Sequence, residues 1–79
     1  MLEVKIWKDG QQPSDPYNHV MVLEHDYQFS SPRYEVILTE GGTVHTGIAF
    51  KSIIEDAVEA AGEEAARHGI DTTVYVKPV

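Results

Sequence analysis

A single helical pattern, bracketed at both ends, constrains the fold of this chain more than any other feature. Between Ser52 and Gly69 apolar residues recur every three or four positions, whereas elsewhere they alternate with polar residues as in strands. Ser52 followed by Glu55 has capping-box spacing, and Gly69 stands where a left-handed helix end is favoured. The sequence therefore predicts one helix, from about Ser52 to His68.

Strand-like segments surround this helix in the order β-β-β-β-α-β. They are Leu2 to Trp7, Val20 to about Gln28, the hairpin RYEVILTEGGTVHTGIAF and the final run DTTVYVKPV. The intervening KDGQQPSDPYN predicts a long loop. With 79 residues, no internal repeat and no linker, the chain reads as one domain, residues 1–79. We predict an α+β fold, an antiparallel or mixed sheet with one helix packed on one face.

The hairpin around the glycines at 41 and 42 has two candidate registers. A two-residue loop pairs Leu38 with His45 and scatters apolar residues over both faces of the sheet. A three-residue loop, residues 40–42, pairs Leu38 with Val44 and gathers the apolar residues on one face. We therefore predict the three-residue loop, which places His45 on the outer face.

The predicted helix has an apolar side and an acidic side. At about 100° per residue, the apolar side collects Ile54, Ala57, Val58, Ala61, Ala65 and His68. The opposite side collects Glu55, Asp56, Glu59 and Glu63. Alanines spaced four apart predict close packing on the sheet, with Val74 and Val76 of the last strand facing the same core and Tyr75 facing away.

The fold does not require the acidic line of Glu55, Glu59 and Glu63, because like charges four residues apart are mildly destabilising. A pair of Glu63 with Arg67 would offset a little of that cost. The simpler interpretation is a solvated face that aids solubility, and the functional alternative is a docking surface for a basic partner. A catalytic carboxylate pair is a third alternative, disfavoured because exposed acids keep ordinary pKa values.

Net charge narrows the choice of partner. The chain carries 13 acidic and 6 basic residues, a formal net charge of −7, and its bases are spread singly. Such a surface repels phosphate groups, so we expect neither direct nucleic-acid binding nor binding to an anionic membrane, whereas a basic protein surface would be attracted. The absence of cysteine and of a signal-like or membrane-length apolar run favours a cytoplasmic protein.

Motifs for catalysis are missing from the chain. It contains no G-x-S-x-G sequence, no phosphate-binding loop and no dinucleotide fingerprint. Its four histidines, His19, His25, His45 and His68, have no productive metal-ligand spacing, and the helix dipole accounts for His68. We predict no catalytic residue, no cofactor and no metal site.

A second candidate surface is the sheet face away from the helix. Trp7, Ile37 and Tyr75 are expected there, exposed because one helix covers only one face. They are either scattered surface side chains or a contact for a partner or a second copy, which would make the protein a homodimer.

The sequence thus favours a non-enzymatic interaction module over an enzyme. In size, acidity and lack of an enzyme motif it resembles the class of small phage-encoded inhibitors, anti-CRISPR proteins among them, which block basic nucleic-acid-handling machinery. That resemblance is to a class and assigns no residue a role. The alternative is a ligand-binding or enzymatic homodimer with a site between subunits, built from His25, Asp26, Tyr27 and the loop QQPSDPYN. A third hypothesis is a purely structural subunit.

Overall fold

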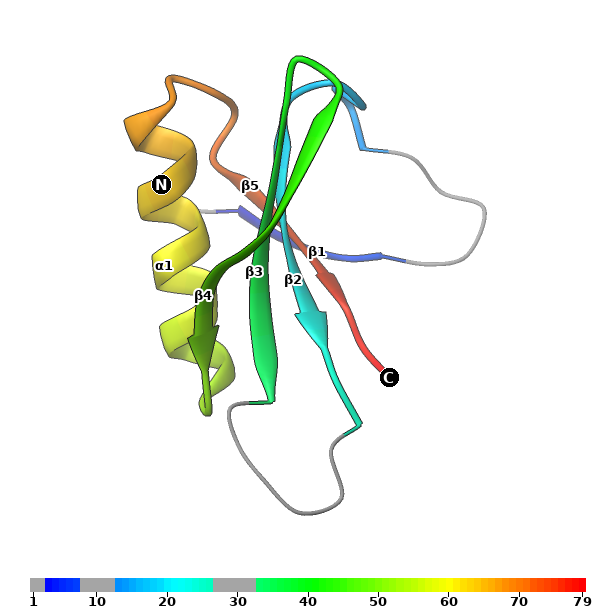
Figure 1. The fold of residues 1–79 in the computed structure, drawn as a ribbon, viewed down its shortest axis with the longest axis vertical. Helices are drawn as coiled ribbons and strands as arrows, with labels where there is room; N and C mark the ends of the chain where they lie inside the picture. The colour runs from blue at the N-terminus through cyan, green and yellow to red at the C-terminus, as the bar shows by residue number, and fades with distance from the viewer. Residues whose placement is uncertain (1–2, 8–12, 27–32) are drawn as a thin grey trace.

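The computed structural model describes residues 3–7, 13–26 and 33–79. Within them the elements follow the predicted order β-β-β-β-α-β (Figure 1), which confirms the α+β class. The elements are β1 Glu3–Ile6, β2 His19–Glu24, β3 Tyr34–Glu40, β4 Thr43–Lys51, α1 Ile54–Arg67 and β5 Thr73–Lys77.

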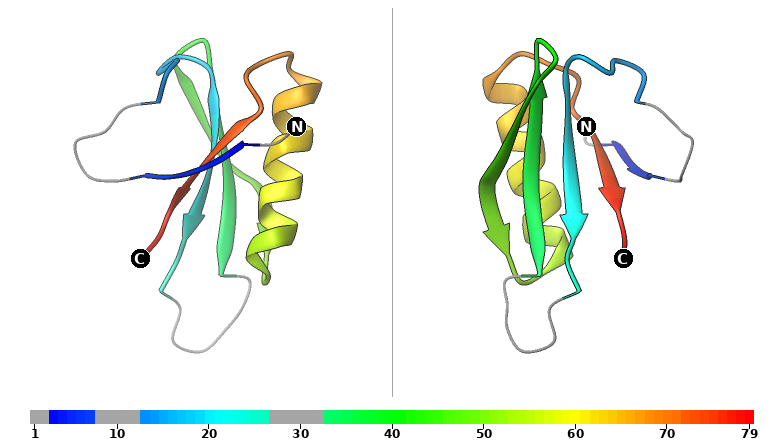
Figure 2. Two further views of the ribbon diagram at one scale, coloured as in Figure 1. Left: turned by 180° about the vertical axis from the view of Figure 1, so that it is seen from behind. Right: turned by 45° about the vertical axis from the view of Figure 1, so that its right-hand side comes forward.

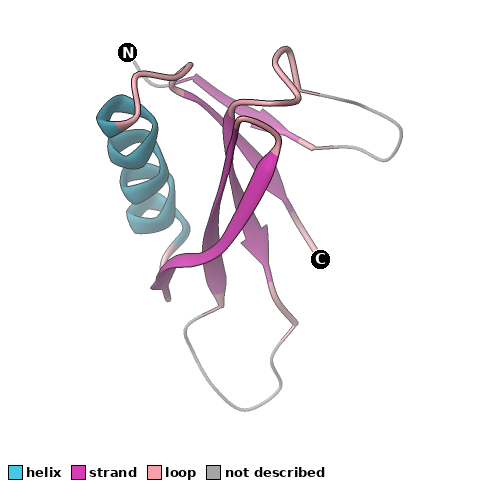
Figure 3. Cartoon of the chain, turned by 45° about the horizontal axis from the view of Figure 1, so that its top comes forward, coloured by secondary structure: helices cyan, strands magenta, loops and turns pink. Residues whose placement is uncertain are grey.

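The strands form one mixed sheet in the order β1-β5-β2-β3-β4. The last strand, β5, lies between β1 and β2 and runs parallel to both, while β2, β3 and β4 pair antiparallel in succession. Helix α1 carries the chain from the β4 edge back to β5 and lies on one side of the sheet (Figures 2 and 3). Strands β1 and β4 are therefore the two edges.

The core lies between α1 and the middle of the sheet. Because side chains alternate along a strand, β2, β3 and β5 each send every second residue toward the helix. The buried cluster comprises Val20, Val22, Val36, Leu38, Val74 and Val76 from the strands and Ala57, Ala61 and Ala65 from the helix. The predicted orientation of β5, with Val74 and Val76 facing the helix, is confirmed.

The two ends of α1 differ in how well the sequence predicts them. The helix begins at Ile54, after an extended Ile53 that makes no side-chain capping bond. The predicted capping box of Ser52 is therefore wrong, because the helix starts one residue later than that spacing requires. At the other end Gly69 has a φ of +66°, and the N–H of Ile70 donates to the Ala65 carbonyl at 3.0 Å. This left-handed end confirms the predicted glycine cap.

The hairpin between β3 and β4 has the register that we rejected. Its turn has two residues, Gly41 and Gly42, with φ of +59° and +82°, and Leu38 pairs with His45. This backbone matches the two-residue turns that suit the twist of paired strands. The predicted three-residue loop is wrong. His45 pairs with the core residue Leu38, so it does not lie on the outer face of the sheet as predicted.

A β-bulge explains why the sequence pattern predicted the wrong hairpin register. Opposite the middle of β3 the register shifts, so that Val36 pairs with Ala49 and not with Gly47. Gly47 lies in this irregular stretch with a φ of +68°, a conformation that glycine adopts without steric cost. The bulge brings the partly buried Ala49 against the core. The predicted register holds only for two continuous strands, and this shift interrupts β4.

Candidate interaction surface

The acidic side of α1 is an open surface. Its four carboxylates, those of Glu55, Asp56, Glu59 and Glu63, belong to exposed residues. The ion pairs found within the described parts of the chain include none of the four. Lys51 shares a shallow hollow with Asp56, Glu59 and Glu63 without forming an ion pair with them. The predicted separation of acidic and apolar sides is therefore present.

Arg67 does not neutralise this surface. Its guanidinium donates to Oε2 of Glu64 at 3.0 Å, one residue beyond the predicted partner Glu63. Glu64 is buried, whereas the Arg67 side chain is 69% exposed, and the pair joins two residues of α1 that are three positions apart. The expected offset of acidic repulsion by a pair of Glu63 with Arg67 is thus absent from the structure.

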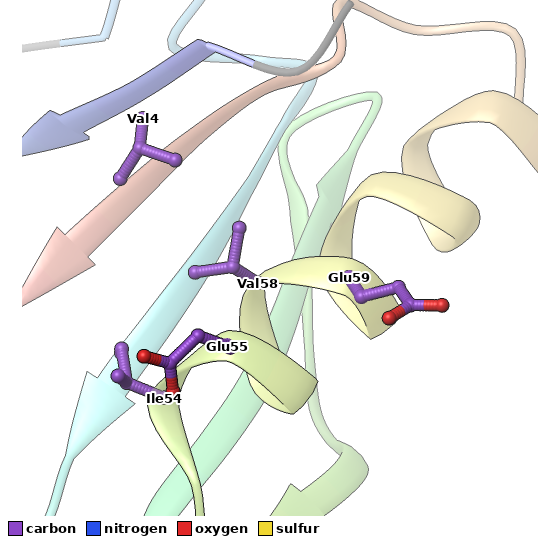
Figure 4. Close-up of a pocket in the computed structure, with 5 residues that line it drawn as sticks. All are labelled: Val4, Ile54, Glu55, Val58 and Glu59. Atoms are coloured by element: carbon purple, nitrogen blue, oxygen red, sulfur yellow. The ribbon is translucent and has the colours of Figure 1, made fainter.

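An apolar groove runs between α1 and the edge strand β1. It has a volume of about 500 Å³ and is lined by Val4, Ile54, Glu55, Val58 and Glu59. Val4 extends from β1, and Ile54 and Val58 extend from the helix into the same space (Figure 4). Glu55 lies beside Ile54 at the rim, whereas the carboxylate of Glu59 points away from Val4. The groove thus has apolar walls and an acidic outer edge.

The strand order explains why this groove is open. Val4 pairs with Val74 and Ile6 pairs with Val76, so both share the face of the sheet that α1 covers. The helix packs on β2, β3, β4 and β5, and it leaves β1 at the margin. Val4 and Ile6 are consequently 49% and 53% exposed. The alternation of apolar and polar residues in this segment places Val4 and Ile6 on one face, but it carries no signal that the strand lies at the edge of the sheet.

The sheet face away from α1 is less open than expected. Ile37 and Tyr75 are 6% and 7% exposed, so the expectation that they are exposed is wrong. The rings of Trp7 and His19 pack on Tyr75 with centroids 5.9 and 6.0 Å away. The phenol oxygen of Tyr75 accepts a hydrogen bond from the Ser14 N–H at 3.1 Å, which ties the loop to this face.

These contacts cover Ile37 and Tyr75, so the exposed apolar residues of this face include Val44 and Phe50 of β4, which pair with Thr39 and Glu35. Trp7 remains half-buried at its margin, and Ile37 lies beside Met21 in the register. The prediction assumed that this face is bare, whereas Ser14, in the described segment before β2, contacts Tyr75 there. The partner-binding role of Trp7, Ile37 and Tyr75 stays a prediction, now with less exposed surface behind it.

A buried carboxylate on the same face was not singled out from the sequence. Glu35, 9% exposed, lies with Oε1 2.7 Å from Nε2 of His25, and its Oε2 accepts the N–H of Gly47 at 2.7 Å. Both oxygens are thus engaged, one by the end of β2 and one by the bulge of β4. A carboxylate can orient a histidine for proton transfer, but here the same group also holds irregular backbone. We interpret Glu35 as a structural clamp for the bulge.

The residues of the predicted intersubunit site are only partly described. His25 contacts Glu35 and Asp26 is exposed, while Tyr27 and residues 11–12 of the loop lie outside the described residues. Within residues 3–7, 13–26 and 33–79, no three histidine or acidic side chains gather as metal ligands. The intersubunit site remains a hypothesis.

His68 links the end of α1 to the hairpin. Its Nδ1 lies 3.0 Å from Oε2 of Glu40, and its Nε2 lies 3.0 Å from Oε1 of Glu64. Ionised carboxylates only accept hydrogen bonds, so an imidazole that binds both must carry two protons. The hydrogen bond to Glu64 is the largest cause of the raised pKa of His68; partial desolvation lowers the pKa and Glu40 raises it further. The helix dipole invoked from the sequence is thus joined by two carboxylates.

Comparison with protein-family models, with curated proteins and with solved structures finds no match to this chain. None of the helical residues that the structure describes forms a segment long and apolar enough to cross a membrane.

Proposed function

We propose that this chain is a non-enzymatic protein-interaction module whose acidic helix face docks on a basic surface of a partner protein. The observation that carries the proposal is the row of exposed carboxylates on α1, which lack a basic partner among the described residues. Carboxylates placed four residues apart repel each other in the free protein. A basic partner would relieve that repulsion, so the free energy that the repulsion costs the free helix would be recovered on binding.

The proposed partner is a protein that handles nucleic acid. Such proteins present clustered lysine and arginine side chains to phosphate groups, and a row of carboxylates offers the same sign of charge. A small acidic domain that occupies this surface would exclude the nucleic acid. Inhibition of this kind, as in the phage-encoded class that includes anti-CRISPR proteins, is the role that we propose for the docking. The size and the charge of the chain support this role, and no shared sequence motif does.

The test removes charge without removing apolar contacts. A triple variant, Glu55→Gln, Glu59→Gln and Glu63→Gln, should fold with equal or slightly higher stability, because it removes like charges from exposed positions. Partners are recovered from a lysate with both baits at low and moderate salt, identified, and the most enriched one is purified for affinity measurement. We expect the triple variant to bind more weakly, and the wild-type affinity to fall steeply with salt.

A control variant separates local from overall charge. Glu3→Gln with Asp26→Asn removes exposed acids that lie outside α1, and it should retain most of the binding. If the same partners bind the wild type and the triple variant equally well at both salt concentrations, the acidic side of α1 is only a solvated surface. If the control variant loses as much affinity as the triple variant, net charge and not the helix face is responsible.

A further inference from the structure

We propose that the groove between β1 and α1 receives an apolar side chain from a partner segment that carries lysine or arginine on either side of it. This inference rests on the proposed function and specifies the chemistry of the partner. It changes the expected contact from a purely electrostatic one to a short amphipathic segment with an anchoring residue.

Two apolar walls face each other across the groove. Ile54 and Val58 lie one helical turn apart on α1, and Val4 faces them from β1 (Figure 4). Val4 is about half exposed, and Ile54 and Val58 are only partly buried. An inserted side chain would remove these groups from water on both walls. Anchors that fill such recesses dominate the energy of many interfaces.

Charge decides among the candidate occupants. The acidic residues Glu55 and Glu59 are the charged residues that line the groove, and no lysine or arginine of the described chain lines it. A second copy would bring another net charge of −7 to this acidic rim, and an anionic membrane would also be repelled. A basic segment is complementary to the rim, and its apolar residue is complementary to the walls. The occupant is therefore a basic, apolar-anchored protein segment.

The groove also makes the acidic side of α1 asymmetric. Glu55 and Glu59 line the groove, and Glu59 also borders the hollow beside Lys51, whereas Asp56 and Glu63 line that hollow and not the groove. A partner seated in the groove should depend on the first pair more than on the second. Docking by charge alone would depend on both pairs to a similar extent.

The experiment uses two short synthetic peptides with the same lysine content. The first carries two leucines one helical turn apart, and the second carries serine in their place. Binding to the full chain is followed by amide chemical shifts in NMR titrations. We expect the leucine peptide to bind at least about tenfold more tightly than the serine peptide, with the largest shifts at Val4, Ile54 and Val58.

Two matched pairs of variants complete the test. Val4→Lys should weaken the leucine peptide about tenfold, whereas Ile6→Lys, on the same face of the same strand and similarly exposed, should change its affinity little. If either lysine variant unfolds, two double variants that remove charge from α1 provide the test instead. Glu55→Gln with Glu59→Gln should weaken binding more than Asp56→Asn with Glu63→Gln, and all four positions are exposed.

The possible outcomes separate this inference from the proposed function. Equal affinity for both peptides, with shifts spread over the four acids of α1, would refute the groove and leave acidic docking standing. A dimer in sedimentation that Val4→Lys converts to a monomer would also refute it, because a second copy would then occupy the groove. If neither peptide binds at its solubility limit, both the groove and the acidic docking surface are wrong.

Discussion

Replacing Glu35 by alanine tests whether a buried carboxylate holds the β4 bulge in place. The substitution removes the acceptor of the Gly47 N–H and the partner of His25, each at 2.7 Å. A hydrogen bond to a charged group contributes about 1.5–3 kcal/mol, so two would contribute roughly 3–6 kcal/mol as an upper bound. Gly47 is exposed and the His25 side chain is 27% exposed, so water can replace part of each bond.

We therefore expect Glu35→Ala to lower the free energy of unfolding by about half of that bound, roughly 1.5–3 kcal/mol. For a domain of this size such a loss corresponds to a fall in melting temperature of roughly 6–24 °C. Glu35→Gln is the matched control. Its amide oxygen can still accept from Gly47, and its volume is unchanged, so it should lose less stability than the alanine variant.

The assay is urea unfolding at neutral pH with linear extrapolation, together with hydrogen exchange of the Gly47 amide. The alanine variant should show a lower unfolding free energy and faster exchange at Gly47. A free energy within about 0.5 kcal/mol of the wild type, the usual range for surface substitutions, with unchanged exchange, would show that the carboxylate does not hold the bulge.

Two further predictions concern pH and core packing. Because the fold raises the pKa of His68, the stabilisation from its contacts with Glu40 and Glu64 should be complete below its unfolded value, near 6.5, and lost as pH rises through the folded value. The stability difference between wild type and His68→Gln should therefore shrink from mildly acidic to mildly alkaline pH in urea titrations, and a constant difference would contradict this. Val36 is fully buried, so Val36→Ala should lower the free energy of unfolding by about 2–3 kcal/mol. Val58 at the groove is only half-buried, so Val58→Ala should lower it less. Equal losses of unfolding free energy in urea would argue against an open groove.

Local periodicity predicted the element order and the inward faces. Alternation in β5 placed Val74 and Val76 in the core, and the spacing of Ala57, Ala61 and Ala65 placed the helix on them. These patterns repeat over two or four residues, so neighbouring positions along the chain are enough to reveal them. The exposed position of the acids on α1 follows from the same periodicity.

Features that depend on distant contacts were missed. The hairpin register depends on a bulge at Gly47, which Glu35 on the neighbouring strand holds by a hydrogen bond. The burial of Tyr75 depends on Trp7, His19 and a loop more than sixty residues away, since Ser14 and Tyr75 are 61 positions apart. The groove exists because β1 is an edge strand, and alternation within β1 does not reveal which strand it pairs with.

The place of β5 between β1 and β2 has a consequence for how the chain folds as it is synthesised. Glu3 pairs with Thr73, so the first and the last strand of the described chain lie side by side. During synthesis β1 leaves the ribosome before the other strands and cannot pair until β5 has emerged. Strands β2, β3 and β4 can already pair with one another through antiparallel contacts. Parallel pairing over such a separation closes late and slowly. We expect β1 to be the last strand to join the sheet and the first to leave it when the protein is pulled apart mechanically.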